Sequence, residues 1–214
     1  MTDDSQEAKT VATYDTYAES WVTEHDDRTD YQAMIRLLQR YVPKGEILEI
    51  GAGGGSDAVL LHEAGYNYLG TDVSAGMVEA AKRHHPDLRF QQLSVYDLAS
   101  LDRQFEGFWA CAVLLHVPKA RIDEALQAVR AVIKLGGAGF ISMKDGTDEV
   151  FESRLKNDRQ EERLFAYWQD EKFRKALIRN GFEVVEYQYK PESERTRWHR
   201  YIVRKTHAED GAEK

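Results

Sequence analysis

The sequence has a single cysteine, Cys111, and this excludes an internal disulfide bond among its 214 residues. It has no apolar run near the roughly 18 residues that a membrane-spanning helix needs. Its first residues, MTDDSQEAKT, lack the basic and apolar regions of a signal peptide. We therefore expect a cytoplasmic protein that does not associate with a membrane.

An excess of positive charge is also absent. The chain has 29 Lys and Arg residues against 37 Asp and Glu residues, which gives a formal net charge of −8. An acidic chain attracts nucleic acid poorly, so a tRNA partner is possible on a local patch but disfavoured. The hydrophobic fraction of 42% and the aromatic fraction of 11% suit a packed core. We expect a packed globular protein that is a monomer or homodimer.

The chain reads as one domain with short tails. Residues 1–10 are polar and have no apolar period, which predicts a disordered tail, and residues 207–214 are predicted to form a second one. Residues 11–42 have apolar and aromatic positions at helical spacing, which predicts helices. Residues 144–168 are charged and irregular. No linker divides residues 11–206, so we predict a single domain there.

Short apolar segments alternate with amphipathic ones between these tails. This order predicts an α/β fold, a parallel sheet covered by helices on both faces, with ligands bound beyond the carboxyl ends of its strands. The last two strands alternate in polarity and are predicted to be antiparallel edge strands. The predicted strands are residues 46–50, 66–73, 88–95, 108–115, 137–144, 182–190 and 198–206. The predicted helices after the N-terminal segment are residues 56–65, 74–85, 118–134 and 170–180.

The first of these strands runs directly into a glycine-rich turn, in EILEIGAGGGSDAV. Glycine allows a sharp turn and lets a ligand approach the backbone, and the following helix N-terminus favours anionic groups. Asp72 ends the second strand, where an acid can accept both hydroxyls of a ribose. Glu49 precedes the turn, and its charge is unfavourable beside a pyrophosphate but suits a ligand with an ammonium or sulfonium group.

Three segments resemble one family. EIGAGGG resembles the acid-and-glycine loop of class I S-adenosylmethionine-dependent methyltransferases, and TDVSAGMVEAA resembles their second-strand signature. WACAVLLHVPKARIDEALQAVRAVIKLGGAGFISMK resembles their fourth strand, the next helix and the fifth strand. The resemblance covers residues 45–145. It implies a Rossmann-like, doubly wound, seven-stranded sheet in the order 3-2-1-4-5-7-6, with the last strand antiparallel. It also implies in-line methyl transfer from S-adenosyl-L-methionine (EC 2.1.1.-) to a small or medium-sized molecule.

The resemblance also implies residue roles. Ser94 stands where the family contacts the edge of the adenine, and many relatives have an acid at this position. A hydroxyl is a weaker hydrogen-bond acceptor than a carboxylate, so we expect a weaker contact with the adenine here. A lid over the cofactor is implied for residues 11–42, and a substrate-side insert for 144–168. No metal site is predicted. The expected cofactor-binding residues are Glu49, Gly51, Ala52, Gly53, Gly55, Asp72, Val73, Met77, Ser94, Val95, Tyr96, Tyr14 and Tyr17. The expected substrate-side residues are Trp21, His116, Lys144 and Tyr167.

His116 is the candidate catalytic residue. It follows an apolar run at the carboxyl end of the fourth strand, where it could take a proton from the nucleophile. A histidine that only caps the following helix fits the same position. Methyl transfer itself needs alignment more than side-chain chemistry, so a missing base would not exclude activity.

Three other functions fit parts of the sequence. A dinucleotide-binding frame that starts at Gly53 would indicate an NAD(P)-dependent oxidoreductase, but it begins too far from the strand end and leaves Glu49 unexplained. Basic residues among aromatics near the C-terminus could serve a tRNA-modifying methyltransferase, although a solvated edge strand gives the same pattern. These residues are Arg195, Arg197, Arg200, Arg204 and Lys205. A cofactor-binding module without turnover is the third alternative.

Overall fold

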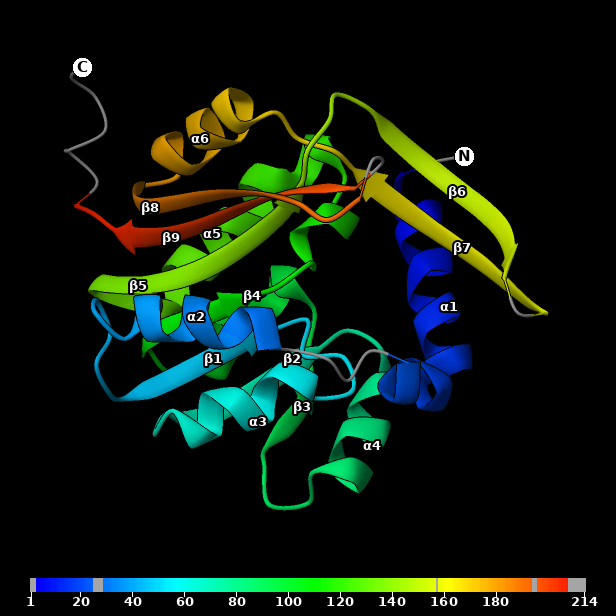
Figure 1. Cartoon of the computed structure of the whole chain (residues 1–214), viewed down its shortest axis with the longest axis horizontal. Coiled ribbons are helices and arrows are strands. Elements are labelled where there is room, and N and C mark those ends of the chain that lie inside the picture. Colours follow the sequence, from blue (N-terminus) through cyan, green and yellow to red (C-terminus); the bar gives the residue numbers. More distant parts are fainter. Residues whose placement is uncertain (1–2, 25–28, 157, 194–195, 208–214) are drawn as a thin grey trace.

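The computed structural model describes residues 3–24, 29–156, 158–193 and 196–207 (Figure 1). None of the helices in these ranges combines the length and apolar character that crossing a bilayer requires. The strands are β1 Glu46–Ile50, β2 Asn67–Asp72, β3 Phe90–Gln92, β4 Phe105–Ala110, β5 Ile133–Lys144, β6 Glu149–Lys156, β7 Arg159–Ala166, β8 Phe182–Pro191 and β9 Arg197–Lys205. The α-helices are α1 Asp3–Glu24, α2 Thr29–Leu38, α3 Ser56–Glu63, α4 Ala75–His84, α5 Ile122–Val132 and α6 Asp170–Arg179. Short 3₁₀ helices are η1 Val95–Leu101, η2 Leu114–His116 and η3 Lys119–Arg121.

Seven strands form one sheet in the order β3-β2-β1-β4-β5-β9-β8. Its neighbours pair in parallel, except that β9 is antiparallel to both β5 and β8. β6 and β7 lie outside this sheet, so β8 and β9 are its sixth and seventh strands. The strand order is therefore 3-2-1-4-5-7-6 with the last strand antiparallel, and the predicted fold is confirmed. The prediction that both final strands lie at the edge is wrong for β9. This strand carries the consecutive apolar residues 201–203, which are buried because both faces of the inner sheet are covered.

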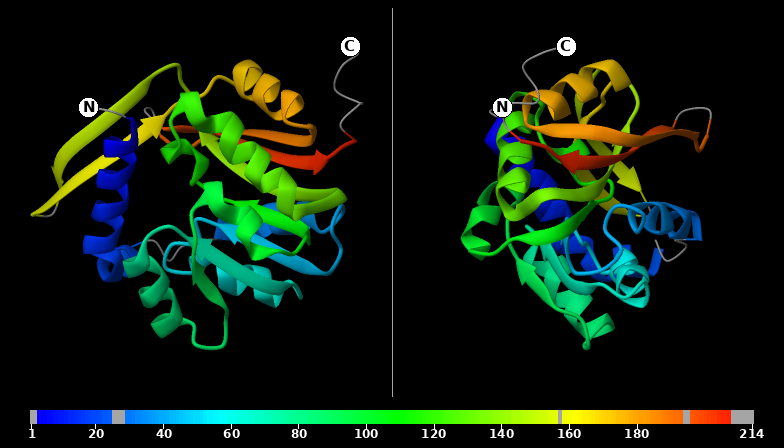
Figure 2. Two further views of the ribbon diagram at one scale, coloured as in Figure 1. Left: turned by 180° about the vertical axis from the view of Figure 1, so that it is seen from behind. Right: turned by 90° about the vertical axis from the view of Figure 1, so that its left-hand side faces the viewer.

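Helices cover both faces of the sheet, as the alternation of elements predicted (Figure 2). Leu48 and Ile50 of β1 pack in a core with buried side chains of α5 and α6. Their neighbour Ile47 points the other way, into a core with side chains of α2, α3 and α4. Because successive strand residues face opposite sides, apolar residues at consecutive positions fill two cores at once.

The charged segment 144–168 was predicted to be irregular, and this is wrong. β6 and β7 form an antiparallel hairpin outside the main sheet. Opposite charges face each other across it, with Glu152 opposite Arg163 and Arg154 opposite Glu161. Such cross-strand pairs stabilise a hairpin. The high charge that suggested a loop is therefore the pattern of a two-stranded ribbon.

The predicted strand 108–115 is too long. β4 ends at Ala110, and Ala112 has a positive φ of 52° that breaks the extended conformation. The chain then forms η2, so His116 lies on a helical turn rather than on a strand.

The predicted disordered tail over residues 1–10 is wrong from Asp3 onward, because α1 begins there. Residues 208–214 of the other predicted tail lie outside the described part of the chain. α1 runs from the β6–β7 hairpin to α4 (Figures 1 and 2). The hydroxyl of Thr10 accepts a hydrogen bond from the Leu164 N–H (2.9 Å), and Thr13 exchanges two with Glu162 of β7 (3.0 Å each). These hydroxyls satisfy backbone groups that β7 would otherwise expose at its edge.

Asp15, further along α1, binds the start of α4. The Asp15 carboxylate accepts hydrogen bonds from the Ser74 hydroxyl (2.6 Å) and the Gly76 N–H (2.8 Å). A Cβ at Gly76 would lie 2.7 Å from the Asp15 carbonyl oxygen, so only glycine allows this approach. α1 is thereby fixed across the carboxyl ends of the central strands, where ligands bind in such folds.

Candidate active site

The glycine-rich turn connects β1 to α3. Gly51 (φ 69°), Gly53 (φ 54°) and Gly55 (φ 88°) all have left-handed backbone conformations that other residues adopt at a cost. A Cβ at Gly51 would lie 2.3 Å from Val113. At Gly53 it would meet no protein atom within 4 Å. The turn therefore needs glycine for its shape, and at Gly53 it also presents open backbone to the space beyond the sheet.

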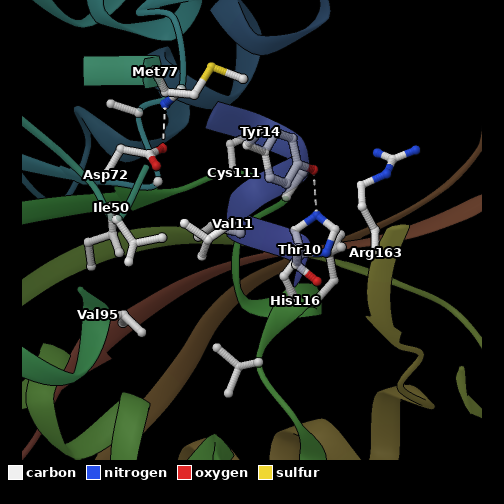
Figure 3. A pocket seen from close by; sticks show the side chains of 18 of the residues that line it. Thr10, Val11, Tyr14, Ile50, Asp72, Met77, Val95, Cys111, His116 and Arg163 are labelled. Carbon is white, nitrogen blue, oxygen red and sulfur yellow. Dashed lines mark hydrogen bonds between the residues drawn. The ribbon is translucent and has the colours of Figure 1, made fainter. Parts of the chain in front are cut away.

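Asp72 connects the turn to the second strand. Its carboxylate accepts hydrogen bonds from the Gly53 N–H (2.8 Å; Figure 3) and from the Ser74 N–H (2.9 Å). Burial raises the pKa of Asp72, and these backbone hydrogen bonds oppose the shift. Each carboxylate oxygen has a second lone pair, so Asp72 can accept further hydrogen bonds from a ligand.

Glu49 is buried at 2% exposure, and its side chain accepts a hydrogen bond from the Tyr68 hydroxyl. Burial, followed by the charge of Glu49, raises the pKa of Tyr68, so this tyrosine stays a donor. The backbone carbonyl of Glu49 accepts a hydrogen bond from the Thr71 hydroxyl (3.0 Å). These contacts join β1 to β2 directly behind the glycine turn.

The glycine-rich turn, Asp72 and Glu49 line one end of a cavity of about 650 Å³. Most of the residues expected in the site meet in it. The expected residues in its lining are Glu49, Gly51, Ala52, Gly53, Asp72, Val73, Met77, Ser94, Val95, Tyr96, Tyr14, Trp21, His116 and Lys144. Figure 3 shows Asp72 and Met77 at one end, and Tyr14, His116 and Arg163 at the other.

Three expected site residues do not line the cavity. Gly55 is the N-cap of α3, where a Cβ would meet His85 and Phe90. Tyr17 lies at the kink of α1, and its hydroxyl accepts from the Gln160 N–H. Tyr167 follows β7 and its hydroxyl donates to Glu152 (3.4 Å). Each of these three residues contacts the helices and strands around the cavity instead of lining it.

The wall beyond β3 is made by η1. Ser94 caps this helix by accepting from the Tyr96 N–H (3.3 Å), so its hydroxyl is already engaged. The Tyr96 hydroxyl donates to Glu7 of α1 (2.5 Å), and the Arg121 guanidinium lies 3.6 Å from the Tyr96 ring centre. The side chain of Met77 is almost fully buried at 1% exposure, so it forms a floor rather than a mobile contact.

His116 occupies the other end of the cavity. Its Nδ1 lies 2.6 Å from the Leu164 carbonyl oxygen and must carry the proton, because a carbonyl only accepts. Its Nε2 is therefore the acceptor for the Tyr14 hydroxyl at 2.8 Å (Figure 3). Burial, and then the charges of Arg163 and Lys144, lower the pKa of His116 to about 3. The ring is neutral at physiological pH.

The neutral state of His116 has a measurable consequence for stability. Between pH 3 and pH 6.5 the unfolded chain binds a proton here and the folded chain does not, so stability falls as the pH falls through this window. We expect His116 to contribute a slope of up to about 1.4 kcal/mol per pH unit. Denaturant unfolding from pH 4 to pH 7 should show a weaker pH dependence for His116→Gln. The exposed His62→Gln variant is the control, and equal slopes for all three proteins would contradict the assignment.

Sequence reasoning missed part of the lining. Arg163 is buried at 7% exposure and makes an ion pair with Glu161 (2.8 Å). It comes from β7, a strand that the charged sequence concealed. Alternation with Phe165 was the available signal, because residues two apart face the same side of a strand. Other lining residues that were not expected include Glu7, Thr10, Val11, Tyr31, Ile50, Asp57, Leu93, Cys111, Val113, Arg121, Phe165, Glu192 and Trp198.

Comparison with known proteins agrees with this geometry. A family model described as a methyltransferase domain matches residues 47–137. The highly reducing polyketide synthase azaB of Aspergillus niger is 35% identical over 146 residues, covering 58% of this chain and 6% of that protein. This chain thus spans only a small part of the synthase. An uncharacterised protein of Methanocaldococcus jannaschii is 28% identical over 176 residues, covering 81% of this chain and 77% of that protein.

A solved structure shows the same fold over nearly the whole chain. The 1,6-didemethyltoxoflavin-N1-methyltransferase of Burkholderia thailandensis, bound to 1,6-didemethyltoxoflavin and S-adenosylhomocysteine, has a TM-score of 0.73 and 18% identity. The alignment covers 96% of this chain and 91% of that one. The sheet order and the matched domain thus define a Rossmann-like methyltransferase fold. Residues 47–137 thus match a methyltransferase domain, and the chain has the fold of the class I S-adenosylmethionine-dependent methyltransferases, as the sequence resemblance implied.

Proposed function

We propose that this protein transfers a methyl group from S-adenosyl-L-methionine to a small or medium-sized molecule (EC 2.1.1.-). One observation carries the proposal: a single cavity has the glycine turn and Asp72 at one end and His116 with Lys144 at the other. Its volume of about 650 Å³ lies within the roughly 300–1,000 Å³ of small-molecule pockets. This space suits the cofactor together with a compact acceptor group.

The residues at the first end fit the cofactor. Gly53 presents backbone where a Cβ would fill open space, which suits close approach by the amino-acid part. Asp72 has remaining acceptor capacity for the ribose hydroxyls. Val95 and Tyr96 would lie along the adenine, with Met77 beneath it. These roles agree with the sign of the charges, because Glu49 and Asp72 favour a cationic ligand over a pyrophosphate.

The protein's part in the reaction is alignment and exclusion of water. The cofactor, when bound, supplies a methyl group on a positively charged sulfur that needs no further activation. α1 covers the cavity and brings Tyr14 into it, which shields the reacting atoms. His116 is neutral, and its low pKa makes it a weak base. We assign it to hold the acceptor by a hydrogen bond to Nε2, in exchange for Tyr14, rather than to remove a strongly held proton.

Three of the basic residues that suggested the tRNA alternative are engaged within the protein, which does not favour it; Arg197 is exposed, and Arg195 lies outside the described residues. Arg200 is buried at 5% exposure, with its guanidinium 4.9 Å from the Tyr31 ring centre. Arg204 makes an ion pair with Glu183 (2.7 Å), and Lys205 donates to the carbonyls of residues 130 and 133. Retention of tRNA on a filter at physiological salt, lost on Arg197→Ala, would nevertheless reinstate it.

Calorimetry with S-adenosylhomocysteine tests the proposal. We expect saturable binding, and no binding of NADH under the same conditions. Absence of S-adenosylhomocysteine binding at millimolar concentration would overturn the proposed function. Release of labelled methyl onto small molecules of a metabolite extract then separates an enzyme from a cofactor-binding module without turnover, which would bind the cofactor and label nothing.

A further inference from the structure

Two cations lie close to one aromatic ring at the acceptor end of the cavity. Lys144, the last residue of β5, places its Nζ 4.4 Å from the centre of the Phe165 ring. The Arg163 guanidinium lies 5.1 Å from the same ring centre and 4.9 Å from that of Trp21. All four residues line the cavity. Figure 3 shows Arg163 on the same side as Tyr14 and His116, away from Asp72.

The neighbouring acids do not neutralise Lys144. Within the described part of the chain, no carboxylate forms an ion pair with it, whereas Arg163 is paired with Glu161. Glu152 accepts from the Tyr167 hydroxyl, and Glu192, which also lines the cavity, accepts from Trp198 Nε1 (2.9 Å).

The pKa of Lys144 reflects the same imbalance. It is lowered by burial and then by the charge of Arg163, with Arg154 acting in the same direction. Glu152 and Glu192 oppose this shift, but each acts less than burial and Arg163 do. A bound anion would reverse the sign of the field at this ammonium group.

We propose that the methyl acceptor is an acid, whose oxyanion binds between Lys144 and Arg163 while an attached flat ring packs against Phe165, Trp21 and Trp198. Arginine and lysine donate charge-assisted hydrogen bonds to carboxylates and phosphonates, and the half-buried position protects these bonds from water. The aromatic walls accept a planar group by offset or edge contacts. This inference rests on the proposed function, because it concerns the acceptor end of the same cavity.

The proposal also explains why a neutral, weakly basic His116 is sufficient here. A carboxylic or phosphonic acid is already ionised at neutral pH, so the oxyanion that binds beside Lys144 and Arg163 does not need His116 to remove its proton. Tyr14 and His116 then provide neutral polar contacts beside the two cations, and the ligand neutralises the excess positive charge.

Calorimetry on the protein saturated with S-adenosylhomocysteine tests the inference with three probes that share a phenyl ring: benzoate and benzamide, which are both planar, and the tetrahedral phenylphosphonate. We expect at least one of the two anions to bind about tenfold or more tightly than the neutral amide. The preferred anion distinguishes a carboxylate from a phosphonate as the natural group. Equal affinity for all three, or no binding of either anion, would overturn the inference.

Variants locate the anion. Lys144→Met keeps the length and apolar stem of the side chain, and we expect it to weaken the preferred anion about tenfold with the amide unchanged. Lys175→Met, at an exposed position on α6, is the matched control and should change nothing. Arg163→Lys tests the second cation while keeping a charge for Glu161. Thermal unfolding verifies that each variant is folded.

Binding of S-adenosylhomocysteine to the same variants separates the two hypotheses. If Lys144→Met leaves this binding intact and removes the anion preference, the cation belongs to the acceptor. If it weakens S-adenosylhomocysteine instead, the cation holds the cofactor's own carboxylate and the inference is wrong, although the proposed function stands. If the wild-type protein binds no S-adenosylhomocysteine, the proposed function itself fails.

Discussion

Asp72→Ala should bind S-adenosylhomocysteine far more weakly than the wild-type protein does. We expect a loss of about tenfold to one-hundredfold for each ribose hydroxyl that the carboxylate accepts, since a hydrogen bond to a charged group contributes about 1.5–3 kcal/mol. The substitution also removes the acceptor for the Gly53 and Ser74 N–H groups, so the empty site loses its order. Calorimetry gives the affinity, and thermal unfolding shows how much stability is lost with it.

Two comparisons make this result specific. Asp87→Ala removes an exposed acid at a distance from the cavity and should leave the affinity unchanged. Burial raises the pKa of Asp72, so acidification should protonate it, and weaken cofactor binding, at a higher pH than an exposed aspartate would require. An Asp72→Ala variant that binds normally, or an affinity that does not depend on pH in the acid range, would remove Asp72 from the ribose site.

The cofactor end of the site could be predicted from the sequence because its geometry is local. Gly51, Gly53 and Asp72 lie directly after two strands that pair in parallel, so the strand ends bring them together whatever the rest of the chain does. The sheet order followed from the resemblance over residues 45–145. The expectation of a positively charged ligand rested on Glu49, which the structure places at 2% exposure.

The acceptor end could not be predicted in the same way, because it is built from contacts between distant segments. Residues 3–10 belong to α1, whose Thr10 and Thr13 hydroxyls satisfy the backbone of β7, 154 and 149 residues away in sequence. Without that partner their polar composition indicates disorder. Arg163 was concealed for the same reason: its burial depends on a hairpin whose strands pair through charges. Tyr17 and Tyr167 have suitable side chains, but only the tertiary arrangement shows that they point away from the cavity.

The positive φ of Gly53 allows a test in which strain and obstruction can be separated. Alanine at this position should cost about 1–2 kcal/mol of stability, because its Cβ disfavours the left-handed conformation. The Cβ meets no protein atom within 4 Å, so the fold can accommodate it. The methyl group would instead occupy the space where the cofactor approaches the backbone. We therefore expect the affinity for S-adenosylhomocysteine to fall by roughly tenfold or more, a loss of about 1.4 kcal/mol or greater.

Gly65 provides the matched control, since it also has a positive φ (90°) and open space for a Cβ, but it follows α3 away from the cavity. Gly65→Ala should lose a comparable amount of stability while binding S-adenosylhomocysteine as the wild-type protein does. Calorimetry and thermal unfolding of the two variants side by side give both quantities. If both variants lose affinity equally, backbone strain alone disturbs the site. If neither does, the cofactor passes elsewhere in the cavity, and the glycine turn serves only to connect β1 with α3.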